Sequence, residues 1–241
     1  MKIKLLSKSP LCLTVDAKDQ FLDAGQAYGV KRRLDSKGHS RPLSELAEVV
    51  SGTVNPQNKA HQSTTFQYID LAEVDEVLGA IMSYRELLGS LIGSSKVKFK
   101  KGNILFAKIR PSIDNKKIAF VYQELENAVA STEFIVLDAK KDVDPFFLYA
   151  AMRSDEFTQA VIDIVGGDTG RQRIKPAQLL QIGIPWPDKD IRDTISKRVS
   201  EFFEALAKTA ALREQAIEIA AEALGATSMK TAQPRRKITK S

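Results

Sequence analysis

The segment VKFKKGNILFAKIRPSIDNKKIAFVYQ, residues 97–123, contains two short runs rich in Ile, Phe and Val, NILFAKIR and KIAFVYQ. Each run is shorter than a typical helix and is bounded by Gly, Pro, Asn or Asp, a pattern typical of β-strands. Two further runs on either side, TTFQYIDL (64–71) and EFIVLD (133–138), have the same character. The sequence therefore predicts a β-rich region between Thr64 and Ile184.

Helical segments are expected before and after these strands. PFFLYAAMRS places Pro145 at a first helical position, and SDEFTQAVIDIVGG begins with Ser154 and Glu156 and ends in two glycines. LSELAEVVSG (43–52) is predicted to form one or two helical turns that stop at Gly52. The expected fold class is α+β, an irregular domain with a curved or partly closed sheet and short helices.

The character of the sequence changes after IPWP, because Asp188 to Leu224 contains no proline and no glycine. This composition predicts one helix, which at 1.5 Å per residue would extend about 55 Å. Its apolar residues keep mostly to one stripe. The stripe consists of Ile191, Ile195, Val199, Phe202, Leu206, Leu212 and Ile219. We expect it to pair with a second copy of the chain or a partner helix; the alternative is that it folds back over the chain's own sheet.

Composition excludes several classes of protein. The apolar content of 43% in 241 residues is that of a globular chain with a sizeable core. The single cysteine, Cys12, cannot form an internal disulfide, and no Cys/His cluster is spaced to hold zinc. No apolar run is long enough to span a membrane, so a cytoplasmic location without cofactor or metal is expected.

The net charge of +6 is concentrated in two places. The final residues 230–241 carry five basic groups and no acid and are expected to form a disordered tail. Residues 96–117 contain eight basic side chains and one acid, which suits contact with nucleic-acid phosphates. These eight are Lys96, Lys98, Lys100, Lys101, Lys108, Arg110, Lys116 and Lys117. The alternative is a solvated face of a lysine-rich protein.

The loop GGDTGRQR (166–173) lacks the Gly-Lys-Ser/Thr ending of a phosphate-binding loop. Its polar side chains are nevertheless suited to a DNA groove, because arginine pairs with guanine and glutamine with adenine. The candidate base-contacting residues are Thr169, Arg171, Gln172 and Arg173. An ordinary turn between a helix and the next strand remains the alternative.

Two patterns suggest catalysis, and neither is complete. VDPFF, with Asp144, resembles the Asp-Pro-Pro-aromatic motif of adenine-N6 methyltransferases, but the glycine-rich cofactor loop is missing. EFIVLDAK ends in Asp138 and Lys140 as in metal-dependent nucleases, although no second acid is defined by the sequence. A helical protein–protein adaptor with incidental basic patches is a third alternative.

Taken in order, five segments resemble the specificity subunit of type I restriction–modification systems. LSELAEVVSGT and YIDLAEVD resemble the start of its target-recognition domain, and residues 97–120 resemble its basic core. ASTEFIVLDAK and TGRQRIKPAQLLQIGIPWPDKDIRDTISKRV resemble its last strands and the start of its spacer helix. Asn103 stands where the family usually has an aspartate.

The resemblance implies a non-catalytic subunit that binds double-stranded DNA and positions a methyltransferase subunit, with a restriction subunit as a further partner. Full-length members have two recognition domains, so the resemblance implies a half-subunit that forms a homodimer through its helix. The implied organisation has four parts: an N-terminal extension (1–42), a target-recognition domain (43–187), a spacer and dimerisation helix (188–225) and a basic tail (226–241).

Overall fold

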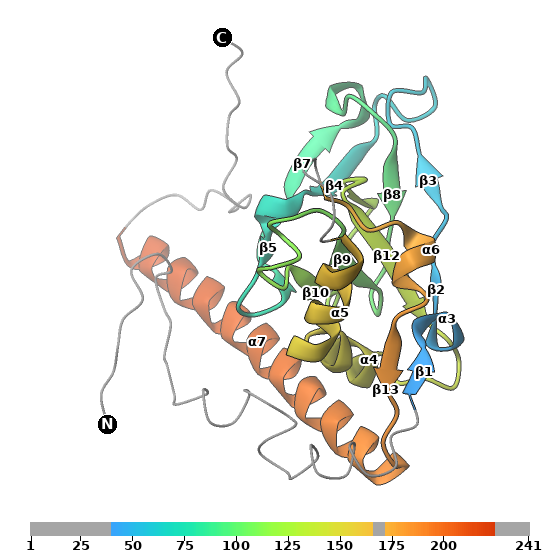
Figure 1. Ribbon diagram of the computed structural model, residues 1–241. Helices are drawn as coiled ribbons and strands as arrows, with labels where there is room; N and C mark the ends of the chain where they lie inside the picture. Colours follow the sequence, from blue (N-terminus) through green and yellow to red (C-terminus); the bar gives the residue numbers. More distant parts are fainter. Residues whose placement is uncertain (1–39, 166–171, 225–241) are drawn as a thin grey trace.

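The computed structural model describes residues 40–165 and 172–224 and has the expected α+β architecture (Figure 1). The N-terminal extension up to residue 39, Thr169, Arg171 and the basic tail from residue 225 lie outside the described residues. Two sheets and a group of helices form successive layers, because each face of the larger sheet packs against a different apolar cluster. No helix in the described ranges is long and apolar enough to cross a membrane.

The larger sheet has six strands and the second has five. In sheet order, the six are β2 (Ala47–Val49), β12 (Phe134–Ala139), β9 (Ile104–Ala107), β10 (Ile118–Phe120), β6 (Ala80–Ile81) and β5 (Val74–Asp75). The five are β3 (Thr53–Val54), β8 (Lys96–Lys98), β11 (Ala128–Ala130), β4 (Thr65–Ile69) and β7 (Arg85–Leu88). All four strands predicted from the apolar runs are present as β4, β9, β10 and β12.

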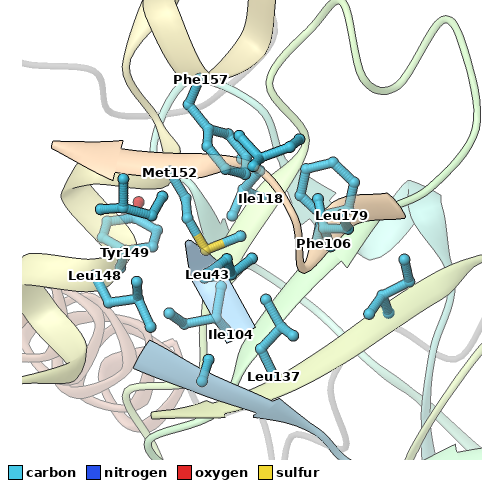
Figure 2. Packing of buried hydrophobic residues seen from close by; sticks show 14 of the residues in the cluster. Leu43, Ile104, Phe106, Ile118, Leu137, Leu148, Tyr149, Met152, Phe157 and Leu179 are labelled. Carbon is cyan, nitrogen blue, oxygen red and sulfur yellow. The ribbon is translucent and has the colours of Figure 1, made fainter. Parts of the chain in front are cut away.

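In the central strands, consecutive residues are apolar instead of alternating between apolar and polar, because both faces of the larger sheet are covered. On β9, Leu105 and Ala107 face the five-stranded sheet, while Ile104 and Phe106 face the helices. Figure 2 shows Ile104 and Phe106 in the helix-side cluster with Leu137, Leu148 and Met152. This two-sided burial fixes the register of β9 against β10 and β12 and thus the ends of the hairpin that follows it.

The helix layer consists of α4 (Pro145–Met152), α5 (Asp155–Val165) and the long α7 (Lys189–Ala223), with the short helices α3 (Leu43–Leu46) and α6 (Pro176–Leu179) at its edge. The short 3-10 helices η1 (Leu71–Glu73) and η2 (Gly89–Leu91) lie in connections. Helix α4 begins where the sequence predicts, since the Asp144 carboxylate caps the amides of Phe146 and Phe147.

The prediction of a helix through Gly52 is wrong. Helix α3 ends at Leu46, and the next three residues form β2 because they pair with β12 from Leu137 to Ala139. Leu43 and Leu46 are fully buried, as a helical face would require, but the apolar residues after them serve the sheet. For residues 47–49, pairing with the open edge of β12 is therefore more favourable than continuing the helix that the apolar spacing predicts.

Helix α7 packs against its own domain along its first half. Val199 and Phe203 are buried in the main core, and Phe203 contacts the rings of Phe120, Tyr122 and Tyr149. Ile195, Phe202 and Leu206 are partly buried against the same cluster. The assignment of these four seam residues, Val199 included, to a partner helix is therefore corrected, since the domain's own aromatic cluster covers them.

Trp186 lies where β13 (Gly183–Pro185) gives way to α7. Its ring is stacked by two guanidinium groups, those of Arg41 at 4.9 Å and Arg192 at 4.2 Å from the ring centroid. Phe147 of α4 meets the same ring edge to face at 5.4 Å between centroids. Strand β1 (Ser40–Pro42), which carries Arg41, pairs with β13, so this packing joins both strands to the start of the long helix.

Candidate nucleic-acid interface

The basic hairpin and the end of the polar loop lie side by side. Arg173 forms a β-bridge with Ile109. The Arg110 amide donates to the carbonyl of Gln172 over 3.1 Å, and the Ile174 amide donates to the carbonyl of Lys108 over 3.0 Å. Residues more than sixty positions apart thus form a short antiparallel ladder next to the end of β9.

Arg173 is held at this ladder by Glu133. Its Nε donates to Glu133 Oε2 over 3.1 Å, and its Nη2 donates to Oε1 over 2.6 Å. The Glu133 carbonyl also accepts the Lys108 amide over 2.9 Å. Because backbone and side-chain bonds meet at one residue, Glu133 ties the start of β12 to both parts of the ladder.

Arg110 is engaged on two sides. Its Nε and Nη2 contact the Asp114 carboxylate at 2.8 and 2.7 Å, and its Nη1 donates to Gln172 Oε1 over 2.8 Å. The hydrogen bond to Asp114 raises the pKa of the Arg110 guanidinium. These contacts orient the Arg110 guanidinium and the Gln172 amide relative to each other, and the phosphate contact expected for Arg110 stays a prediction.

The remaining lysines of the hairpin have different surroundings. Lys108 is half-buried, Lys116 pairs with Asp155 of α5, and Lys117 Nζ donates to the carbonyl of Leu71 over 2.8 Å. Lys116 adopts a positive φ of 49°, which the turn between β9 and β10 requires. Lys108 thus lies in the ladder beside Arg173, whereas Lys116 and Lys117 contact α5 and η1.

The other predicted basic residues do not join this group. Lys100 and Lys101 precede β9, whereas Lys108 follows it, and a four-residue strand spans about 13 Å. Lys100 pairs with Asp138 at 3.1 Å, while Lys98 and Lys101 are exposed. The basic segment therefore contributes lysines to two separate regions of the surface, one at each end of β9.

Lys96 is removed from the expected phosphate contacts. Only 7% of the residue is exposed, and its Nζ donates to the carbonyl and the Oγ of Ser94. Burial lowers the pKa of this lysine. The Lys96 amine also lies over the ring of Tyr68, 5.4 Å from its centroid. The lysine of β8 therefore packs against Tyr68 of β4 on one face of the five-stranded sheet.

A second polar cluster surrounds Tyr68. The Tyr68 Oη donates to Asp70 Oδ2 over 2.9 Å, and Arg85 lies 3.2 Å from Glu73 and 4.6 Å from the Tyr68 ring centroid. Burial, reinforced by Asp70, raises the pKa of Tyr68 to about 12. Burial alone would raise the pKa of Asp70, but hydrogen bonds from Leu71 and Tyr68 lower it overall. The cations and acids pair with each other, so this cluster serves the fold.

The candidate catalytic residues have structural roles. Asp144 is the cap of α4, Asp138 pairs with Lys100, and Lys140 Nζ donates to the carbonyl of Ser44 over 2.8 Å. Within residues 40–165 and 172–224, no group of three or more His, Cys, Asp or Glu residues is placed to hold a metal ion.

Sequence reasoning missed Glu133 and Asp114 as partners of the basic residues. Asp114 is four residues after Arg110, a spacing that in a turn carries no clear signal. Glu133 lies forty residues from Arg173 and looks like an ordinary polar residue before a strand. Only the fold brings these acids to the arginines.

Comparison with known proteins gives a consistent result. A family model described as type I restriction modification DNA specificity domain matches residues 37–218. The specificity subunit of the HindI type I restriction enzyme from Haemophilus influenzae is 32% identical over 107 residues, which cover 44% of this chain and 23% of that protein.

Two solved structures share the fold. The HsdS subunit from Thermoanaerobacter tengcongensis matches with a TM-score of 0.59 and 26% identity, over 78% of this chain and 47% of that one. A structure from work on the complex assembly and conformational transition of the type I R-M system matches with a TM-score of 0.59 and 25% identity, over 83% and 52%. The chain spans about half the length of these solved relatives.

Proposed function

The chain belongs to the type I restriction modification DNA specificity domain family, and from this membership we propose that it recognises a double-stranded DNA sequence as a specificity subunit. The observation that carries the proposal is the ladder between Lys108–Arg110 and Gln172–Ile174. It brings phosphate-binding and base-reading types of side chain to one place, as specific recognition requires.

Within this proposal the residues divide into two roles. Lys108, Lys116 and Lys117 contact phosphates and fix the register of the protein on the duplex. Gln172 and Arg173, with Thr169 and Arg171 next to them in the sequence, approach base edges in the major groove. Residues 43–187 serve as the recognition unit, and the helix that follows positions it.

The test is selection from a randomised duplex pool, with the full chain alone and with the methyltransferase subunit of its own system. We expect a defined motif in the retained DNA. Lys108→Ala should weaken binding to all sequences alike and reduce the salt slope by about 1. Lys197→Ala, an exposed lysine on α7, is the matched control and should change neither quantity. Recovery of no motif in either sample would contradict the proposal.

We further propose that the second half of α7 forms a homodimer contact. Leu212 and Ile219, seven residues apart and therefore on the same face of the helix, are 55% and 66% exposed. Such an apolar surface on one helix is suited to pairing with another helix. A two-fold pair would present two recognition units to a palindromic or inverted-repeat target with a fixed spacer.

The partners proposed for the DNA-bound subunit are a methyltransferase subunit and a restriction subunit, and the chain itself is proposed to perform no chemistry. Incubation of the lone chain with plasmid DNA and Mg²⁺, or with a methyl donor, should give neither cleavage nor methylation. Activity that disappears in Asp138→Ala or Asp144→Ala would refute this part of the proposal.

A further inference from the structure

Glu133 occupies one edge of the Arg173 guanidinium, and no other residue of the described chain occupies the opposite edge. Arginine has five N–H groups, and Glu133 accepts one from Nε and one from Nη2. Among the described residues, the Nη1 group makes no hydrogen bond or ion pair. The Nη1 and Nη2 hydrogens on that edge are parallel, which is the geometry that pairs with guanine O6 and N7.

Arg173 is an exposed residue, so its side chain can be reached by a ligand. The Arg173 and Glu133 side chains are 38% and 27% exposed. An ion pair exposed to this degree contributes little to stability, since solvent screens the attraction. Its main physical effect is to fix the direction in which the arginine points.

The neighbouring Arg110 provides a contrast. Asp114 binds the Nε and Nη2 edge of Arg110, but Gln172 Oε1 takes the Nη1 edge. Both edges of Arg110 are therefore used within the protein. Of the two arginines in the ladder, only Arg173 has an edge without a partner among residues 40–165 and 172–224.

A carboxylate is otherwise unfavourable at this surface. Glu133 lies beside Lys108, which we assign to a phosphate, and a negative charge there repels the DNA backbone. A residue that served general affinity would be neutral or basic. The repulsion between Glu133 and the DNA backbone lowers general affinity, and a carboxylate at this position is explained if it improves discrimination between bases.

We infer that Glu133 is a specificity-determining positioning residue, which holds Arg173 by one edge so that the other reads a guanine in the major groove. This inference rests on the proposed function and deepens it. It assigns base discrimination at one position of the target to the Glu133–Arg173 pair.

The experiment compares base preference with general affinity, because the two respond differently to geometry and to charge. The wild-type motif is first obtained from the duplex pool. Binding of each variant is then measured to the motif duplex, to duplexes in which each guanine is replaced in turn, and to an unrelated duplex.

Glu133→Asp keeps the charge but withdraws the carboxylate by about 1.5 Å, the length of one C–C bond. We expect discrimination at one guanine to fall roughly 5- to 150-fold, the range of a good bidentate pair, with unchanged binding to unrelated DNA. Arg173→Lys should give the same loss, because an ammonium group cannot form the two parallel bonds. Glu133→Gln should also lose discrimination, but its binding to unrelated DNA should rise because a negative charge is removed.

Glu201→Gln removes the same charge from an exposed ion pair on α7 and is the matched control. Thermal unfolding of every variant checks that the domain is folded. Wild-type base preference in Glu133→Asp, or an equal loss of affinity for all duplexes in Arg173→Lys, would overturn the inference while leaving the proposed function intact. If the wild type itself yields no motif, the proposed function fails and this inference fails with it.

Discussion

A Cβ atom on Gly79 would lie 2.0 Å from the Oη of Tyr149, and that same Oη donates to the Gly79 carbonyl over 3.1 Å. Gly79 has a φ of 58°, in the left-handed region that favours glycine. Arg153, at the end of α4, donates to the carbonyls of Glu76 and Val77 in the same turn. The turn between β5 and β6 is thereby fastened to α4, on which α7 packs.

Gly79→Ala should lower the free energy of unfolding by about 2–4 kcal/mol, since it adds a steric overlap to an unfavourable backbone conformation. Urea denaturation measures this directly. Gly102→Ala, which has a φ of 89° and open space around it, isolates the backbone contribution and should cost less. Gly93→Ala, with neither feature, should have little effect. Equal stability of the three variants would contradict the steric argument.

Stability should also fall at high pH because of Tyr149. Burial raises the pKa of this phenol from 10.0 to about 12, so the folded state holds the proton more tightly than the unfolded state. The stabilisation is complete below pH 10 and is lost as the pH rises through 12, which amounts to about 1 kcal/mol between pH 9 and pH 11. Urea denaturation at both values should show this share of the decline disappear in Tyr149→Phe. A decline of the same size in that variant would assign the effect to other groups.

The attachment of α7 to the domain depends on Phe203. Its ring lies among Phe120, Tyr122, Phe146 and Tyr149, with centroids 5.1 to 6.3 Å away. Phe203→Ala should cost about 3–5 kcal/mol, the usual range for a buried phenylalanine. Phe202→Ala, which removes a ring that is only partly buried, should cost less in the same denaturation experiment. The reverse order would show that the helix packs differently.

The distal half of α7 allows the proposed pairing to be tested separately from folding. Leu212→Glu or Ile219→Glu should reduce a dimer to a monomer in light scattering, with unchanged thermal unfolding of the domain. Ala207→Glu adds the same charge at an exposed position on the far side of the helix and should leave the dimer intact. A wild-type chain that stays monomeric at high concentration, or variants that remain dimeric, would exclude this surface as the contact.

The long apolar strands could be predicted from the sequence because their burial on both faces leaves a continuous run, as in β9 and β12. The two-residue strands β5 and β6 could not, since their pairing depends on a turn that Tyr149 and Arg153 hold from outside. Residues 47–49 were assigned to a helix because Leu43, Leu46 and Val50 have helical spacing. Spacing alone does not reveal that β12 offers an open edge.

Charge selected Lys108 and Lys117 as DNA-contacting candidates and loop chemistry selected Gln172 and Arg173, and their contacts with DNA stay predictions. The structure adds that Lys108 and Arg173 lie side by side. Burial could not be read from charge, so Lys96 was included although its amine faces Ser94. The carboxylate partners remained hidden because Glu133 and Arg173 meet only when β12 and the loop after α5 are placed together.

Trp186 is the only tryptophan in the 241 residues, and it lies between Arg41 and Arg192 at the root of the long helix. The chain therefore carries an intrinsic fluorescence reporter at the point where the long helix begins. A shift of the first turn of α7 relative to β1 would change the distances from the indole to Arg41 and Arg192 and so change its emission, without an attached dye. Recording Trp186 fluorescence during titration with duplex DNA would then show whether DNA binding at the ladder moves the start of α7.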